Sequence, residues 1–121
     1  MSVSNPVRLA SQSGLSVELT GSGALRRIDH RDVIVNLFVG TEVGGGPANL
    51  FLRRRGRGFA WVPLLGPQGQ GRVRLDETGL EIPGEWSGLR FAVSLQLADS
   101  APAWFWHVAL ENAGRAPESV D

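Results

Sequence analysis

The side chains of this chain that could perform acid–base chemistry are two nearby carboxylates and two histidines. Glu81 and Glu85 flank Pro83, and a glycosidase-like pair needs carboxylates about 5–10 Å apart across a pocket. His30 lies in a polar turn sequence and His107 in an apolar segment, where histidines are more often solvated or half-buried than bases. No serine has the sequence context of a nucleophile elbow. We therefore assign no catalytic residue to the chain.

Cofactor and metal chemistry also lack a suitable motif. The chain has no cysteine, which excludes thiolate chemistry, disulfides and a cysteine-based zinc site. Its two histidines are too far apart in the sequence to predict a metal cluster. The glycines in Gly44–Pro47 could cradle a phosphate, but the spacing fits neither G-x-G-x-x-G nor the Walker pattern. We expect a flexible or tightly turned loop there, and no cofactor.

Four tryptophans raise the possibility of sugar binding, because flat sugar faces stack on indole rings. Trp104 and Trp106 alternate with other residues on one apolar strand face, so we expect them in the core. Trp61 and Trp86 lie beside predicted loops and are the candidates for a carbohydrate-binding platform. In the competing interpretation the aromatic rings fill the core, where burying one contributes roughly 4–6 kcal/mol as an upper bound.

The basic residues are all arginines, 12 of them, and 12 acidic residues balance them. Arginine-only usage is typical of a GC-rich bacterial genome. Arg53–Arg55 and Arg57 form a cluster that could contact nucleic acid. Zero net charge and the lack of interleaved aromatic residues instead favour a strand end whose arginines pair with carboxylates or contact a neighbouring domain. We expect no nucleic-acid partner.

Length and hydropathy indicate one domain, residues 1–121. No apolar run approaches the ~20 residues needed to span a bilayer. The first residues do not have the charged and then apolar pattern of a signal peptide. We expect a cytoplasmic protein without a membrane partner.

The clearest structural pattern is a predicted hairpin. Apolar and mostly polar residues alternate through Leu89–Leu97, turn residues occupy Asp99–Pro102, and alternation resumes after the turn. The second arm places Phe105 and His107 on a mixed outer face. Its core face is expected to carry Trp104, Trp106, Val108 and Leu110. Such a hairpin must bury its apolar face against a second layer.

In the rest of the chain, the sequence pattern predicts short strands separated by turns. It contains 16 glycines and seven prolines, and no segment has sustained helical periodicity. The nearly continuous apolar run 33–39 predicts a strand covered on both faces. We count eight or nine short strands and little helix, which predicts an all-β, antiparallel β-sandwich.

Five segments in order carry a family resemblance. They are RRIDHRDVIVNLF, GGGPANLFLRRRG, VPLLGP, GEWSGLRFAVSLQLA and APAWFWHVALENAG, within residues 15–116. Together they resemble the N-terminal β-sandwich of glycoside hydrolase family 94, closest to its β-1,2-oligoglucan phosphorylase-like branch. The resemblance implies a truncated sandwich of the galactose-mutarotase-like type. It also implies a C-terminal (α/α)6 barrel that carries the catalytic acid, so no catalytic position transfers to this chain.

The function implied by this resemblance is a non-catalytic segment of a glycoside phosphorylase-like enzyme with a structural, domain-contact role. The expected partner is the (α/α)6 barrel or a second subunit. The alternative is a stand-alone carbohydrate-binding module for β-glucan oligosaccharides, with Trp61 and Trp86 as its platform. The candidate contact residues lie in predicted loops, at an arginine strand end and on the outer hairpin face. They are Arg53, Arg55, Leu64, Leu65, Phe105 and His107.

Overall fold

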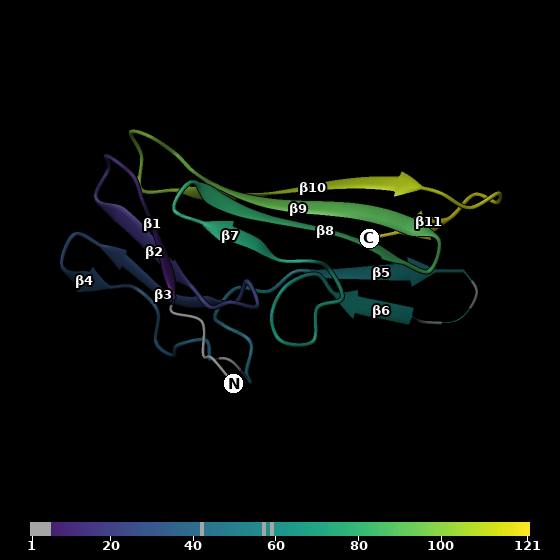
Figure 1. Cartoon of the computed structure of the whole chain (residues 1–121), viewed down its shortest axis with the longest axis horizontal. Helices are drawn as coiled ribbons and strands as arrows, with labels where there is room; N and C mark the ends of the chain where they lie inside the picture. Colours follow the sequence, from purple (N-terminus) through teal and green to yellow (C-terminus); the bar gives the residue numbers. More distant parts are fainter. Residues whose placement is uncertain (1–5, 42, 57, 59) are drawn as a thin grey trace.

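A computed structural model describes residues 6–41, 43–56, 58 and 60–121. Within these residues the chain is all-β, with antiparallel strands and no α-helix, which confirms the predicted fold class (Figure 1). The described part accordingly has no helix that is long and apolar enough to cross a membrane. Its strands are β1 (Val7–Ala10), β2 (Leu15–Leu19), β3 (Leu25–His30), β4 (Val33–Ile34), β5 (Phe51–Arg55), β6 (Ala60–Pro63), β7 (Arg74–Asp76), β8 (Gly79–Trp86), β9 (Leu89–Leu97), β10 (Trp104–Asn112) and β11 (Ser119–Val120).

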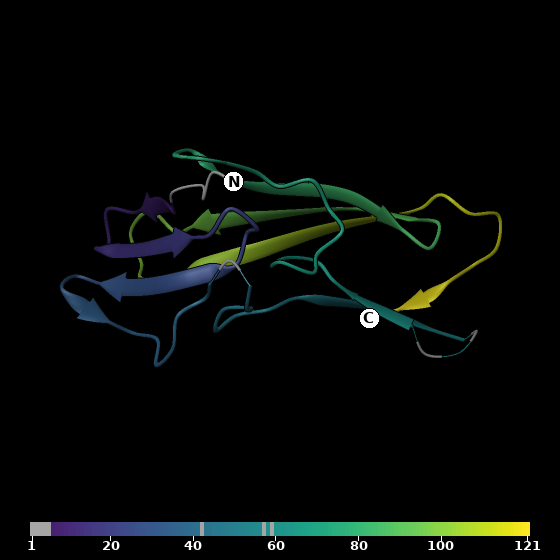
Figure 2. The same cartoon turned by 60° about the horizontal axis from the view of Figure 1, so that its bottom comes forward.

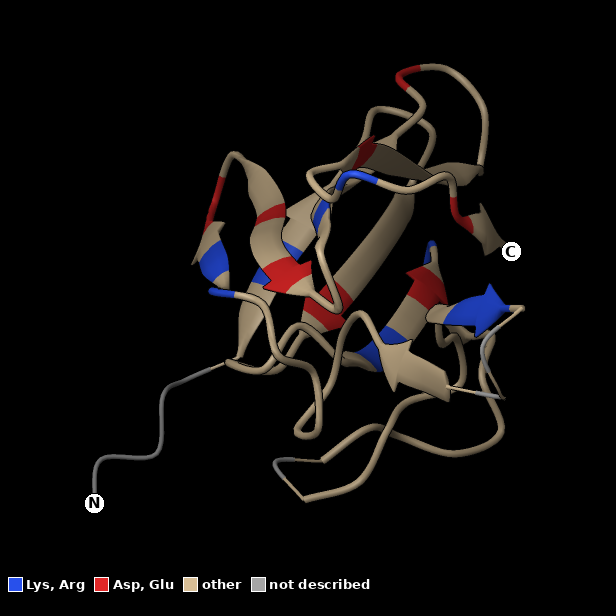
Figure 3. Cartoon of the chain, turned by 90° about the vertical axis from the view of Figure 1, so that its right-hand side faces the viewer, with Lys and Arg blue, Asp and Glu red and all other residues tan. Residues whose placement is uncertain are grey.

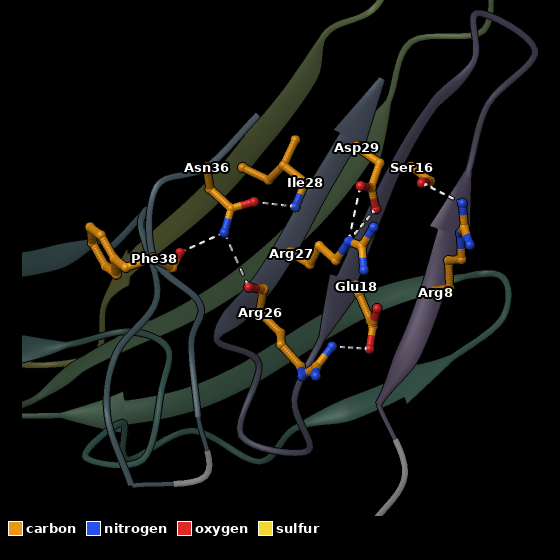
Figure 4. A network of polar contacts seen from close by, with 9 residues as sticks. All are labelled: Arg8, Ser16, Glu18, Arg26, Arg27, Ile28, Asp29, Asn36 and Phe38. Atoms are coloured by element: carbon orange, nitrogen blue, oxygen red, sulfur yellow. Dashed lines mark hydrogen bonds and ion pairs between the residues drawn. The ribbon is translucent and has the colours of Figure 1, made fainter. Parts of the chain in front are cut away.

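The first sheet has the strand order β1-β2-β3-β4. Alternation in β2 buries Val17 and Leu19, while Glu18 points to the outer face. On that face Glu18 accepts a hydrogen bond from Arg26 at 2.7 Å, and Arg27 pairs with Asp29 at 2.9 Å (Figure 4). The sheet therefore has one apolar inner face and one charged outer face.

The second sheet is the longest and has the order β10-β9-β8-β7. Strand β9 is central, and its burial alternates as its sequence predicts. Ser87 and Gly88 join β8 to β9 with φ angles of 53° and 79°, as a two-residue type I′ hairpin requires. Strand β10 pairs with β9 along its whole length, Trp104 opposite Leu97 and Asn112 opposite Leu89, so the predicted hairpin is present.

The third sheet has the order β11-β5-β6. Leu52 and Val62 lie opposite each other and are buried. Arg54 shares the inner side with Leu52, and its guanidinium donates a hydrogen bond to the Ser87 hydroxyl in the β8–β9 turn. This contact links the third sheet to the long second sheet.

All three sheets contribute to one core. The second sheet spans the molecule, with the first sheet at one end and the third at the other (Figures 1 and 2). The buried apolar side chains are Leu9, Leu15, Val17, Leu19, Leu25, Ile28, Leu52, Val62, Leu64, Leu65, Leu80, Ile82, Leu89, Phe91, Val93 and Leu95. The smaller sheets together provide the second layer that the hairpin needs.

Two predictions about burial were wrong. Trp104 and Trp106 pack half-buried against the core, but Val108 and Leu110 are 41% and 45% exposed on the same face. In the described part β10 is an edge strand, so its side chains are less covered than those of the central strand β9. Segment 33–39 is not a doubly covered strand: only Val33–Ile34 is strand, and the apolar side chains of the segment are exposed.

Candidate interaction surfaces

The two tryptophans predicted as a platform lie in different sheets. Trp61 is on β6 of the third sheet and is 61% exposed. Its ring meets Phe51 edge to face, with centroids 5.4 Å apart. Trp86 ends β8 and packs against the core. Trp61 therefore belongs to an exposed aromatic pair with Phe51, and Trp86 is a half-buried packing residue.

The outward arginines of β5 pair with a carboxylate on the neighbouring chain segment. Arg53 donates from Nε to the Asp121 carboxylate at 2.7 Å, and Arg55 approaches the same group at 3.7 Å. Backbone hydrogen bonds of 2.8 and 3.0 Å join Arg53 to Asp121 in both directions. The hydrogen bond lowers the pKa of Asp121 and raises that of Arg53. The structure thus shows the predicted alternative in which arginines pair with carboxylates; Arg57 lies outside the described residues.

The prediction that Leu64 and Leu65 form a contact surface was wrong. They are only 2% and 3% exposed, because the loop turns both side chains into the core. Two backbone hydrogen bonds fix the loop: Leu64 N–H donates to Leu50 C=O at 2.9 Å, and Gly66 N–H to Ser22 C=O at 3.0 Å. Neither leucine is accessible to a partner.

The outer face of the second sheet carries the other two predicted contact residues, Phe105 and His107, and both are exposed. His107 ends a cross-strand row that continues through Ser94 and Glu81 to Arg74. This row lines an open hollow of about 560 Å³. The face is therefore accessible and of mixed polarity.

The predicted acid–base pair is not assembled in this hollow. Glu81 and Glu85 lie on the same strand, β8, four residues apart, which separates them by about 13 Å. In the described residues, no group of three histidine, cysteine or carboxylate side chains is placed to hold a metal ion. Glu81 lines the hollow and Glu85 does not, so the predicted pair does not face one site.

Six of the twelve large apolar side chains that are exposed in the described part lie in segment 33–39, which we call the apolar ridge. It begins with β4, which pairs with the edge of β3 opposite β2, and continues from the first sheet toward the chain that leads to β5 (Figure 1). Leu37 is fully exposed and Phe38 mostly so. The six exposed apolar residues of the ridge are Val33, Ile34, Val35, Leu37, Phe38 and Val39. The ridge is therefore a candidate interaction surface.

Asn36 fixes the shape of the ridge. Its side-chain oxygen accepts a hydrogen bond from Ile28 N–H at 2.8 Å, and its amide nitrogen donates to the carbonyls of Arg26 and Phe38 (Figure 4). Val35 N–H also donates to Ile28 C=O at 2.8 Å. The amide thus takes the place of a regular ladder along β3, and the flanking apolar side chains are left facing outward.

Two glycines allow the chain after the ridge to pack on β3. A Cβ on Gly40 would lie 2.4 Å from the Leu25 carbonyl oxygen, and one on Gly46 would lie 1.9 Å from it. No side chain fits at such distances. The glycine-rich run therefore has a packing role.

Charged positions of both signs are interspersed among neighbouring strands (Figure 3). Arg90 of β9, for example, lies 3.8 Å from Glu111 of β10, and Arg26 lies beside Glu18. Exposed pairs of this kind contribute little to stability. The ridge differs from these faces because it has no charged side chain of its own.

Comparison with known proteins identifies the family of the chain. A family model described as the SOGP N-terminal domain matches residues 18–121. No match was found among curated proteins. The sequence resemblance had instead indicated the N-terminal domain of glycoside hydrolase family 94, and the family match corrects that assignment.

The functions drawn from that resemblance are corrected with it. The match points away from a segment of a glycoside phosphorylase and from a carbohydrate-binding module for β-glucan, and it gives no evidence of carbohydrate metabolism. The apolar ridge was missed from the sequence because an apolar run predicts a buried strand. The one signal against burial was Asn36 in its middle, an amide that needs hydrogen-bond partners if it is buried.

Proposed function

Because the chain belongs to the SOGP N-terminal domain family, we propose that it is a polypeptide-binding domain whose apolar ridge packs against another part of its parent protein. The family description supports this choice of partner, since an N-terminal domain precedes further sequence in the proteins that carry it. The proposed partner surface is apolar and without charge, to match the six exposed side chains of the ridge.

One observation carries the proposal: the ridge exposes consecutive apolar side chains in a conformation held by Asn36. Leaving Leu37 and Phe38 in water forgoes roughly 1.5–3 kcal/mol of burial for each side chain. A partner that covers both gains that free energy without having to order the ridge, because the Asn36 hydrogen bonds already hold it. Apolar side chains that are already held in one conformation bind a partner at a lower cost in conformational entropy than mobile ones.

A second exposed cluster extends the same function to the third sheet. Phe51 and Trp61 form an aromatic pair beside the Arg53–Asp121 ion pair. Tryptophan and arginine are enriched among the residues that dominate binding energy at protein interfaces. We assign this cluster a supporting contact, and the ridge the principal one.

The test is binding between this chain and the region that follows the domain in an SOGP protein, expressed as a separate polypeptide. Calorimetric titration should detect an interaction, and Leu37→Asp should weaken it at least about 30-fold, because an aspartate would be desolvated in an apolar contact. Trp61→Ala should weaken it by a smaller factor.

Gln68→Asp is the matched control, because Gln68 is exposed on a different loop. It should bind like the unmodified chain. Equal binding by the Leu37→Asp and Gln68→Asp variants would refute the role of the ridge. If no binding is detected with the unmodified chain, the proposed partner is wrong.

A further inference from the structure

The outer edge of β10 is a second candidate interaction surface, independent of the ridge. Strand β10 is nine residues long and ends the sheet order β10-β9-β8-β7, so no described strand pairs with its outer edge. It contains one acidic residue, Glu111, and no arginine or proline. Natural edge strands are usually short, bulged or charged, because an open edge attracts another strand. Strand β10 is long, its pairing with β9 contains no bulge, and Glu111 near its end is its one acidic residue.

The hydrogen-bond pattern shows which backbone groups are open. Ala113 N–H donates to Gly88 C=O, and Ala98 N–H donates to Ala103 C=O. In an antiparallel pair, residues bonded to the neighbour alternate with residues whose groups point away. The odd-numbered residues of β10 therefore bond to β9. The open N–H and C=O groups belong to Trp104, Trp106, Val108, Leu110 and Asn112.

The same even-numbered residues carry the side chains on the core face. Val108 and Leu110 face the same side as the buried Val93 and Phe91, which lie opposite them on β9, yet they remain 41% and 45% exposed. An added strand would satisfy the open backbone groups and extend the core over both side chains at once. The outer edge of β10 can therefore accommodate another strand.

We propose that this strand is β10 of a second copy of the chain, antiparallel about a two-fold axis at Val108. This register pairs all nine residues and forms about ten backbone hydrogen bonds. It places Trp106 opposite Leu110 and Val108 opposite Val108 of the second copy, so apolar side chains meet. Glu111 falls opposite Phe105, and therefore no like charges face each other.

Sedimentation equilibrium tests the proposal on the full chain. At roughly 100 µM we expect a mass about twice the monomer's 13.0 kDa. Val108→Lys should weaken dimerisation at least about tenfold, because an inward-pointing charge on an edge strand opposes pairing. Val43→Lys is the matched control, since Val43 is nearly fully exposed in a distant loop, and it should dimerise normally. Leu37→Asp, the variant that tests the ridge, should also dimerise normally.

Cysteine crosslinking tests the register, and it does not depend on the Val108→Lys variant folding. The chain has no cysteine. In the proposed dimer the two Val108 Cα atoms lie about 5.5 Å apart, within disulfide range. Val108→Cys should crosslink under mild oxidation at least about ten times faster than Leu37→Cys, although Leu37 is the more exposed. A monomeric chain, a Val108→Lys variant that dimerises normally, or equal crosslinking rates would overturn the proposal.

Discussion

Replacing Asn36 by aspartate tests how the apolar ridge is held. The Asn36 amide accepts a hydrogen bond from Ile28 N–H at 2.8 Å and donates to the carbonyls of Arg26 and Phe38. Asn36→Asp keeps the acceptor and the shape. It replaces the donor by a carboxylate oxygen that faces two carbonyl oxygens. Asn36→Ala removes all three hydrogen bonds and leaves the Ile28 N–H without its partner.

The expected size follows from these contacts. The loss of two hydrogen bonds has a net cost of about 1–3 kcal/mol, and a negative charge that faces two carbonyl oxygens adds to this cost. We expect Asn36→Asp to lower the free energy of unfolding by about 2–3 kcal/mol at pH 7. Asn36→Ala should cost about 1–3 kcal/mol, mainly through the unpaired Ile28 N–H.

The pH dependence has a definite sign. The carbonyl neighbours disfavour the charged carboxylate, so they should raise the pKa of the introduced aspartate in the folded state above its unfolded value of about 3.9. A raised folded pKa stabilises the variant below the unfolded pKa, and this stabilisation is lost as pH rises through the folded pKa. The cost of Asn36→Asp should therefore be smallest below about pH 4, where the acid can donate to one carbonyl.

Urea unfolding followed by tryptophan fluorescence at several pH values measures these differences. Gln68→Glu makes the same amide-to-acid change at an exposed position and should stay within about 0.5 kcal/mol of the unmodified chain. The reasoning about Asn36 fails if Asn36→Asp is equally mild at pH 7, or if its cost does not vary with pH.

Four further substitutions have distinct expected results. Gly46→Ala should lower the free energy of unfolding by about 2–3 kcal/mol or more, because its Cβ would lie 1.9 Å from a backbone oxygen. Gly44→Ala, with its nearest neighbour a side-chain oxygen at 3.3 Å, should stay within about 1 kcal/mol in the same urea unfolding assay. In an NMR titration of the side-chain carboxyl carbon, Asp121 should have a midpoint below about 3.9, and Arg53→Gln should move it back toward that value; an unshifted midpoint contradicts the ion pair. Leu37→Asp should change stability by less than about 0.5 kcal/mol, since the side chain is fully exposed, and a larger loss would mean that it packs within the domain.

Local alternation predicted much of the fold. The period of two in Leu89–Leu97 predicted both the strand and its buried face, and the predicted hairpin with β10 is present. Burial on β10 was harder to predict, because it depends on what lies beyond the strand. Val108 has the correct face but lies at a sheet edge, and the sequence pattern does not contain that information.

Which side chains are exposed, and which of them pair, depends on contacts between residues distant in sequence. Arg53 and Asp121 are 68 positions apart, so their pairing has no local signal. Leu64 and Leu65 lie in a turn sequence that predicts exposure, yet backbone bonds to other segments direct them inward. For the ridge the prediction failed in the opposite direction: burial was predicted, but the side chains are exposed. The reason is that hydrogen bonds of Asn36 to the edge of β3 replace a buried ladder.

Hydrogen exchange of residues 33–39 in the presence of the downstream polypeptide tests the central claim most directly. If the ridge is the binding surface, exchange in this segment should slow at least about tenfold on binding, while the β8–β9 turn at Ser87–Gly88 exchanges as before. Binding that leaves residues 33–39 unprotected would contradict the claim.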